Sequence, residues 1–276
     1  MLSAKHLCVG ALSALSLWSG APANAQFKDL GSAPGQDYEF SVAPYLYLPI
    51  STTGSSTIGG VTTDLDISGS ELLDALNLAG SLRAEVKKGR YSLIVDGYFA
   101  SLGASQTVVA PSGILTADVT FRQSWIAALG AYRLHEGPVD SEGSQHFAID
   151  GGVGVRWNRL RQEVDASVDL GTSPGLQTGI GGTEDWIEPV IMLRAGMDLT
   201  EEWVLGGRLE LGGFGANGSE LQWSLLIGGI YQPWENTDLR LGWQFYGIDF
   251  ATERADGSFG YDVFATGPYL AASFRF

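Results

Sequence analysis

The sequence predicts an all-β protein, folded as a closed antiparallel transmembrane β-barrel of about ten strands, with eight or twelve strands as alternatives. The chain of 276 residues is 45% hydrophobic and only 17% charged. After Ala25, however, no segment has the ~18 consecutive apolar residues that a membrane-spanning helix needs. Segments in which apolar and polar residues alternate recur along the chain instead. Because a backbone in lipid must satisfy its N–H and C=O groups internally, such strands can cross a membrane only as a closed barrel.

The N-terminus has the pattern of a secretory signal peptide. Within residues 1–25, a basic start at Lys5 precedes an apolar stretch, and Ala23-Asn24-Ala25 provides a cleavage site between small residues. We therefore expect residues 26–37 to be a flexible lead-in and residues 38–276 to form one barrel domain. The only cysteine lies in the signal segment, so we expect the mature chain to have no disulfide and no cysteine metal site.

Five strands are predicted in the first part of the barrel, each from one apolar face at every second residue. They cover residues 38–48, 78–86, 91–103, 115–134 and 146–160. In chain order, the apolar faces consist of Tyr38, Phe40, Val42, Leu46 and Leu48; Leu78, Leu82, Ala84 and Val86; Leu93, Val95 and Phe99; Val119, Phe121, Trp125, Ala127 and Leu129; and Phe147, Ile149, Val153, Val155 and Trp157. Gln123 interrupts the fourth of these faces, which is the least regular.

Five further strands complete the predicted ring, at residues 186–199, 203–213, 221–232, 238–250 and 264–276. The apolar faces of the first two consist of Ile187, Ile191, Leu193, Ala195, Met197 and Leu199, and of Leu205, Leu209 and Leu211. The next two strands form a hairpin across residues 233–237. In the last strand one face is made of Pro268, Leu270, Ala272, Phe274 and Phe276.

The connections between the predicted strands alternate strictly between short and long. The short turns lie around Lys88, at 135–145, around Glu201 and around Glu235. The longer or glycine-rich connections are 51–77, 104–114, 161–183, 214–220 and 251–258. Because outer-membrane barrels place short turns in the periplasm and longer loops outside, we expect both termini of the barrel domain on the periplasmic side. The first long connection should hold a short helix at 70–77, capped by Ser68 or Ser70, and an extra hairpin or two further strands at 57–67.

Charged side chains fall on the strand face opposite to the apolar one. This inward set consists of Arg83, Glu85, Asp96, Asp118, Arg122, Asp150, Arg156, Glu188, Arg194, Arg208, Glu210, Arg240 and Arg275. Charges of this kind would be costly against lipid. They indicate either a charged pore lining that selects ions or small solutes, or a salt-bridged network that fills a narrow barrel. Since eight strands are just filled by their side chains and sixteen or more leave a channel, about ten strands favour the filled lumen.

The sequence predicts no catalytic residues, no metal site and no cofactor. His135 and His146 are the only histidines after the signal segment, and both flank a turn that we place on the periplasmic side. A surface enzyme would need its base on the outer side, where the substrate arrives. The formal net charge of −15 excludes nucleic acid as the main partner.

Two groups of residues admit both a structural and a functional interpretation. Carboxylates in the predicted outer loops are explained by solvation, although they also suit Ca²⁺ or Mg²⁺ shared with lipopolysaccharide phosphates: Glu163, Asp165, Asp169, Glu184 and Asp185. Aromatic residues near strand ends indicate interfacial girdles, with a carbohydrate platform as the alternative for the loop-proximal ones: Tyr91, Tyr132, Trp157, Trp186, Trp203, Tyr231 and Trp234.

Three stretches carry a resemblance to a known class of protein. They are residues 43–49, residues 212–219 with Trp223 after them, and residues 267–276, in which Phe274 and Phe276 match the C-terminal assembly signal of outer-membrane barrels. The chain resembles the small outer-membrane β-barrel proteins of Gram-negative bacteria, loosely akin to OmpA-like and OmpW-like barrels. The resemblance implies the fold, a location in the cell outer membrane, and contact with lipid, lipopolysaccharide and the barrel-assembly machinery. It brings no catalytic residues.

We therefore expect a non-enzymatic outer-membrane protein, either a narrow, porin-like channel for small solutes or ions or a structural surface protein. One alternative is an outer-membrane enzyme that acts on lipid A, phospholipid or peptide. The other is an adhesin that works through residues 51–77 and 161–183.

Overall fold

The computed structural model describes residues 38–110, 113–139, 145–169 and 176–276, which contain twelve strands and one helix. The predicted signal peptide (1–25) and lead-in (26–37) lie outside the described residues. In chain order the elements are β1 (Tyr38–Tyr47), β2 (Ser51–Ile58), β3 (Val61–Ser68), α1 (Gly69–Ala75), β4 (Leu76–Lys88), β5 (Tyr91–Ala110), β6 (Gly113–Pro138), β7 (His146–Asp169), β8 (Leu176–Asp198), β9 (Trp203–Ala216), β10 (Ser219–Tyr231), β11 (Thr237–Arg254) and β12 (Gly257–Arg275).

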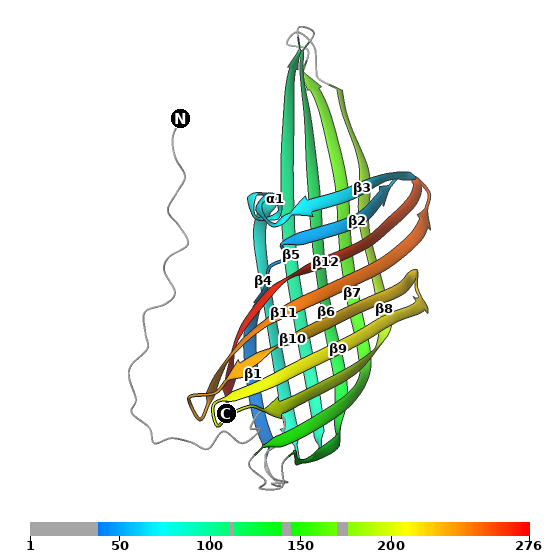
Figure 1. Cartoon of the computed structure of the whole chain (residues 1–276). Helices are drawn as coiled ribbons and strands as arrows, with labels where there is room; N and C mark the ends of the chain where they lie inside the picture. Colours follow the sequence, from blue (N-terminus) through cyan, green and yellow to red (C-terminus); the bar gives the residue numbers. More distant parts are fainter. Residues whose placement is uncertain (1–37, 111–112, 140–144, 170–175) are drawn as a thin grey trace, which may run out of the picture.

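Ten of these strands form a closed antiparallel ring (Figure 1). Its order is β1-β4-β5-β6-β7-β8-β9-β10-β11-β12, and β12 pairs back to β1. The closing pair places Ser41 opposite Arg275 and Leu46 opposite Leu270. A closed ring leaves no strand edge facing lipid, which is the condition for crossing a membrane with strands. The predicted all-β barrel is confirmed.

The other two strands form the extra hairpin that the sequence allowed at 57–67. At its tip, Gly59 and Gly60 have φ angles of 58° and 78°, and a tight hairpin turn requires positive φ at both central positions. The hairpin pairs with the upper part of β12, where Thr57 lies opposite Gly260 and Ser51 opposite Thr266. It therefore continues the barrel wall above the end of β1 (Figure 1).

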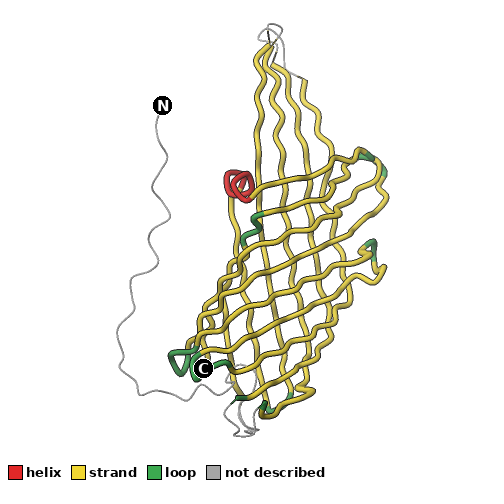
Figure 2. Tube along the Cα trace, in the orientation of Figure 1, coloured by secondary structure: helices red, strands yellow, loops and turns green. Residues whose placement is uncertain are grey.

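Helix α1 follows the hairpin and lies beside the upper edge of the barrel (Figure 2). Ser68 is its N-cap and completes a capping box with Glu71. The Ser68 backbone N–H donates to the Glu71 carboxylate at 2.8 Å, and the Ser68 hydroxyl donates to it at 2.7 Å. These hydrogen bonds lower the pKa of Glu71. The predicted helix is confirmed with Ser68 as its cap, and no helix among the described residues is long and apolar enough to cross a membrane.

Strands β5 to β8 are longer than the sequence predicted. They have 20, 26, 24 and 23 residues, against 13 in β4 and 14 in β9, and they rise above the rest of the barrel (Figure 1). Most of the segments 104–114 and 161–183, predicted as loops, are therefore paired strands. The prediction ended each strand where its outward face stops being apolar. That point marks the edge of the lipid, whereas the backbone pairing continues beyond it.

The outer surface of the ring carries an apolar belt. Its lipid-facing side chains are about half exposed in the bare barrel and come from strands all round the ring: Leu82, Val95, Ile126, Val155, Leu193 and Leu241. At the end of the barrel with the short turns, aromatic rings pair across strands. The ring centroids are 5.1 Å apart for Tyr91 and Tyr132 and 4.9 Å apart for Trp203 and Tyr231. Such a belt with aromatic residues at its margin matches the hydrocarbon core and the headgroup level of a bilayer.

Candidate functional site

A network of charged side chains crosses the middle and lower parts of the lumen, where the lower end of the barrel is the end with the short turns. We define this luminal network as Arg83, Glu85, Asp96, Arg133, Asp150, Arg156, Glu188, Arg194, Arg208 and Glu210. None of these side chains is more than 13% exposed. Charges buried to this extent need partners of opposite sign, because the cost of leaving water is otherwise not recovered.

Arg156 is the central cation of the luminal network. Its guanidinium contacts Glu188 at 3.4 Å and Glu210 at 2.5 Å. It also lies over the ring of Trp125, 5.0 Å from the ring centroid. Glu188 accepts further hydrogen bonds from Ser219 and from the indole N–H of its neighbour on β8. This cluster fixes the side chains at mid-height by charge, hydrogen bonding and ring stacking together.

Ion pairs also run from one side of the barrel to the other. Arg83 on β4 lies 3.1 Å from Asp96 on β5 and 3.9 Å from Glu210 on β9. Arg208 on β9 lies 3.7 Å from Asp96. Strands β4 and β9 are five places apart in the ring of ten and so face each other across it. The Arg83–Glu210 and Arg208–Asp96 pairs therefore span the lumen, whereas Arg83 and Asp96 lie opposite each other on neighbouring strands.

A second crossing lies lower in the barrel and is centred on Arg194. From β8 its guanidinium donates to both oxygens of Glu85 on β4, at 2.8 and 3.0 Å. It also donates to Asp150 on β7 at 2.8 Å, and Asp150 accepts from Arg133. Paired hydrogen bonds between guanidinium and carboxylate are among the strongest polar contacts in proteins. They tie three strands together near the short turns.

The structure thus brings nine of the predicted inward residues into the luminal network, which consists of two clusters of ion pairs, one at mid-height around Arg156 and a lower one around Arg194. Two others lie apart from it at the lower rim, where Arg240 and Arg275 contact the buried Asp238, each at 2.8 Å. Arg133 and Asp238 were not predicted. Asp238 begins the predicted strand 238–250 and was left out of the inward set, although it lies two residues before the inward Arg240. Arg133 was missed because the inner face of β6 was assigned wrongly.

Arg122 and Asp118 are corrections to the predicted inward set, since both lie exposed on the outside of β6. Residues directly opposite each other in a sheet share a face, and Trp125 lies opposite the inward Tyr98. Phe121 and Trp125 therefore point into the lumen, and Ile126 faces the lipid. Both faces of this strand are largely apolar around residues 125–131, so alternation could not decide between them.

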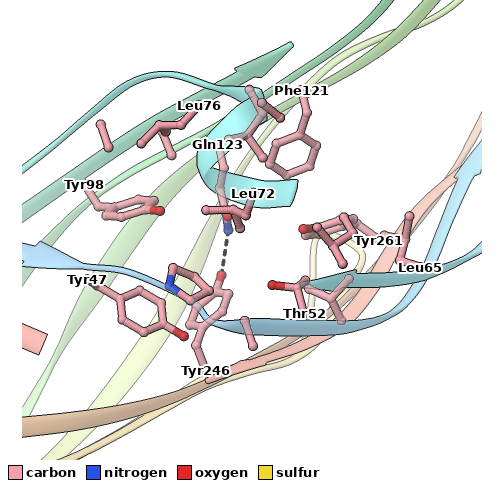
Figure 3. A pocket seen from close by; sticks show the side chains of 18 of the residues that line it. Tyr47, Thr52, Leu65, Leu72, Leu76, Tyr98, Phe121, Gln123, Tyr246 and Tyr261 are labelled. Atoms are coloured by element: carbon pink, nitrogen blue, oxygen red, sulfur yellow. Dashed lines mark hydrogen bonds between the residues drawn. The ribbon is translucent and has the colours of Figure 1, made fainter. Parts of the chain in front are cut away.

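An apolar cavity of about 270 Å³ lies above the luminal network, in the outer half of the lumen (Figure 3). We call it the outer pocket. Its wall contains seven aromatic side chains: Tyr45, Tyr47, Tyr98, Phe121, Trp125, Tyr246 and Tyr261. Leu65 of β3, Leu72 of α1 and Leu76 of β4 add aliphatic surface from the hairpin and helix. Four charged residues line it as well: Arg156, Arg208 and Glu210 of the luminal network, and Glu163.

Most of the exposed wall of the outer pocket is apolar, although polar side chains such as Gln162, Ser224 and Gln244 also line it. Gln123 donates to the Tyr246 hydroxyl at 2.7 Å (Figure 3). The hydroxyl of Tyr47 is buried and has no hydrogen-bond partner within the described part of the chain. A buried hydroxyl without a partner is costly and uncommon, and a bound molecule can satisfy it. The pocket therefore favours a small, largely apolar molecule with one polar group.

The sequence did not reveal the outer pocket, although Tyr98 was placed inward correctly. Phe121, Trp125 and Trp186 were all expected on the outer surface. Trp186 is in fact only 5% exposed and stacks inside the barrel on Phe250, with ring centroids 3.9 Å apart. The signal that the sequence did offer is the set of five tyrosines at inward positions: Tyr45, Tyr47, Tyr98, Tyr246 and Tyr261.

The two histidines lie at the lower end of the barrel, away from the outer pocket. The His146 imidazole is 3.6 Å from the Asp198 carboxylate, and His135 lies beside Phe147. Among the described residues, no three His, Cys, Asp or Glu side chains gather in a way that could hold a metal ion. The buried polar side chains of the barrel interior include amides such as Asn158, Gln162 and Gln222, besides the ion pairs and tyrosine hydroxyls.

A closed antiparallel ring with an apolar belt and marginal aromatic rings defines an outer-membrane β-barrel protein. The predicted location in the cell outer membrane follows from this architecture. No protein-family model matches the chain, and no curated protein matches it.

Several solved structures are similar to the chain in fold. The outer membrane protease OmpT from Escherichia coli has 11% identity and a TM-score of 0.48, and the match covers 90% of this chain and 99% of OmpT. Ail, the attachment invasion locus protein of Yersinia pestis, has 10% identity and a TM-score of 0.36, covering 87% and 99%. Neisserial surface protein A has 13% identity and a TM-score of 0.31, covering 87% and 97%. At such low identity the likeness concerns the fold alone.

Proposed function

We propose that this protein is a non-enzymatic outer-membrane barrel that binds a small, largely apolar molecule in the outer pocket. The observation that carries the proposal is the pocket itself, a cavity of about 270 Å³ with an aromatic wall that stands directly on buried ion pairs. Burial of apolar surface yields roughly 25 cal/mol per Å², so a ligand that fills such a cavity gains its affinity from desolvation. The free Tyr47 hydroxyl would orient its polar group.

The proposal also takes the lumen below the pocket to be closed. A solute that moves along the axis would have to separate Arg194 from Glu85 and Arg83 from Glu210. Separating a buried pair leaves uncompensated charges, at a cost of about 3–5 kcal/mol. Between a charged pore lining and a filled lumen, we therefore propose the filled lumen.

The positions of the histidines support a non-enzymatic role. His135 and His146 lie at the opposite end of the barrel from the outer pocket, so neither can act on a molecule bound there. Incubation of the folded protein with lipid A, phospholipid and peptides should leave all three unchanged. Release of fatty acid or of a cleaved peptide would contradict this part of the proposal.

The binding proposal is tested by filling the pocket. Ala100 lines the outer pocket, and Ala128 is exposed on the lipid face of the neighbouring strand. Ala100→Phe should weaken binding of the fluorescent probe N-phenylnaphthylamine about tenfold, since the added ring takes the place of the guest. Ala128→Phe adds the same ring outside the pocket and should leave the affinity unchanged. Equal affinity in both variants would overturn the proposal.

Conductance tests the closed lumen separately. Folded protein in a planar bilayer should give no discrete current steps, and heat-dependent migration on a gel would verify that the barrel is folded. Regular steps from folded protein would contradict the closed lumen and favour the porin-like alternative.

A second candidate function is attachment at the cell surface, favoured by the projection of β5 to β8. Above the apolar belt these strands carry exposed apolar side chains, including Val108, Val109 and Ile180. Removal of the paired segments 105–118 and 165–179, with each cut end joined by a short turn, would test this role. Attachment should fall while the barrel stays folded, and unchanged attachment would contradict the adhesin alternative.

A further inference from the structure

A second cavity, of about 70 Å³, lies in the lower half of the lumen beside β9, β10 and β11. Four arginines line it, and the described lining contains no carboxylate. These arginines are Arg83, Arg194, Arg208 and Arg240. Their carboxylate partners contact them from outside the cavity, so four cationic groups border a single hollow.

Glycine residues of β9, β10 and β11 border the hollow. On the inner face of the sheet, Gly196 of β8 lies opposite Gly206 of β9, Gly206 opposite Gly228 of β10, and Gly228 opposite Gly242 of β11. The last three of these glycines line the cavity. At Gly206 an added Cβ would meet its nearest atom at 3.6 Å, so this glycine leaves open space beside the cavity. At Gly228 and Gly242 an added Cβ would collide with a backbone carbonyl oxygen of the neighbouring strand, so these two glycines allow the strands to approach closely.

Arg208 has donors that the protein does not use. Its side chain is only 12% exposed, yet its guanidinium makes no hydrogen bond within the described residues. The nearest carboxylate oxygens lie 3.4 Å away on Glu210 and 3.7 Å away on Asp96. Its Nε is buried with no acceptor in hydrogen-bond geometry. A guanidinium group has five N–H donors, and buried donors without an acceptor cost free energy. A bound molecule that accepts hydrogen bonds from Arg208 would remove this cost.

We propose that this arginine-lined cavity binds a small inorganic anion, a halide or an oxoanion such as phosphate. Arg208 would donate to the anion directly, and Arg83, Arg194 and Arg240 would supply the surrounding positive field. A water needs about 10–15 Å³ of such space, so the cavity has room for an anion with part of its hydration shell. An anion offsets the mutual repulsion of the four guanidinium groups, which water does only weakly.

This inference is independent of the proposed function, because the cavity lies below the outer pocket and has the opposite chemistry. Bromide is a suitable probe, since its anomalous scattering locates it in crystals of the folded barrel. We expect an anomalous peak within hydrogen-bond distance of the Arg208 guanidinium. In detergent, the unfolding midpoint should rise when chloride replaces the bulkier anion gluconate at constant ionic strength.

Two variants test the assignment. Arg208→Met should weaken bromide binding roughly tenfold and remove the chloride dependence of the midpoint. Arg159→Met, which removes an exposed arginine on the outside of β7, should keep both. If Arg208→Met does not fold, Gly206→Ala replaces it, because the added Cβ lies 3.6 Å from Ile230 and fits while narrowing the cavity. Folded wild-type protein with no bromide peak and a chloride-independent midpoint would show that the cavity holds water only.

Discussion

The lower and upper halves of the lumen are built from the same strands and have opposite chemistry. On the inner face of β5, Asp96 joins the luminal network, and Tyr98, two residues further up, lines the outer pocket. Below this level the strands reach across the lumen with paired charges. Above it the wall is completed by the β2–β3 hairpin and α1, which contribute leucines. Two neighbouring inward positions of one strand thus belong to different regions, the first to the luminal network and the second to the outer pocket.

The largest expected effect concerns the lower half. Arg156→Met leaves Glu188 and Glu210 buried without their central cation, so the free energy of unfolding should fall by about 3–5 kcal/mol. Urea unfolding of the folded barrel measures this change. The control is Arg159→Met, whose ion pair with Asp185 is exposed and should be worth at most about 1 kcal/mol. Similar losses in both variants would mean that the luminal network is not the main source of stability.

The next effect concerns the upper half. Leu72→Gln places an amide at the edge of the outer pocket and should weaken N-phenylnaphthylamine binding about tenfold, with little change in barrel stability. Leu73 lies on the same helix but is 55% exposed, so Leu73→Gln is the matched control. A loss of affinity in both variants would indicate that α1 as a whole, rather than the pocket-facing side, affects binding.

A smaller effect should appear at the boundary between the halves. Trp125 lines the outer pocket and stacks on Arg156 of the luminal network. In a double-mutant cycle, Trp125→Leu and Arg156→Met should show a coupling energy of about 1 kcal/mol in urea unfolding. Additive losses would mean that the two halves are energetically separate.

The smallest effect concerns the cap of α1. Ser68→Ala should speed amide hydrogen exchange in residues 69–76 and leave the exchange of the barrel strands unchanged. Since Ser68 lowers the pKa of Glu71 below its unfolded value, the stabilisation is present at neutral pH and is lost as the pH falls through the folded pKa. Exchange should therefore accelerate in mild acid, and Glu71→Gln should abolish this pH dependence. If amide exchange in α1 of the Glu71→Gln variant depended on pH as it does in the wild type, the assigned role of Glu71 would be contradicted.

The inner face was predictable wherever one strand face is charged and the other apolar. In β4 and β8 this contrast places Arg83, Glu85, Glu188 and Arg194 inside on local pattern alone. In β6 both faces carry apolar residues, so the pattern has no preferred face, and the register to β5 decides instead. That register depends on contacts between strands, which a single segment does not contain.

The outer pocket, together with the β2–β3 hairpin and α1 that complete its wall, was less predictable than the luminal network. The sequence indicated a hairpin at 57–67 and a helix at 70–77, and both are present. Their position over the lumen depends on the pairing of β2 with the upper part of β12. This pairing joins a segment near the N-terminal end of the barrel domain to a segment near its C-terminal end. No local pattern encodes such a contact, and the cavity exists only because of it.

The β2–β3 hairpin has a consequence for how a guest enters and leaves. Within the described residues β3 has one strand neighbour, β2, and α1 lies between β3 and β5. At this height the wall is therefore joined on one side by helix packing rather than by a ladder of hydrogen bonds. Displacement of about two turns of helix breaks no pairing between strands. We expect exchange with the pocket to be governed by the desolvation of Leu72 and Leu76, while the ring itself stays closed.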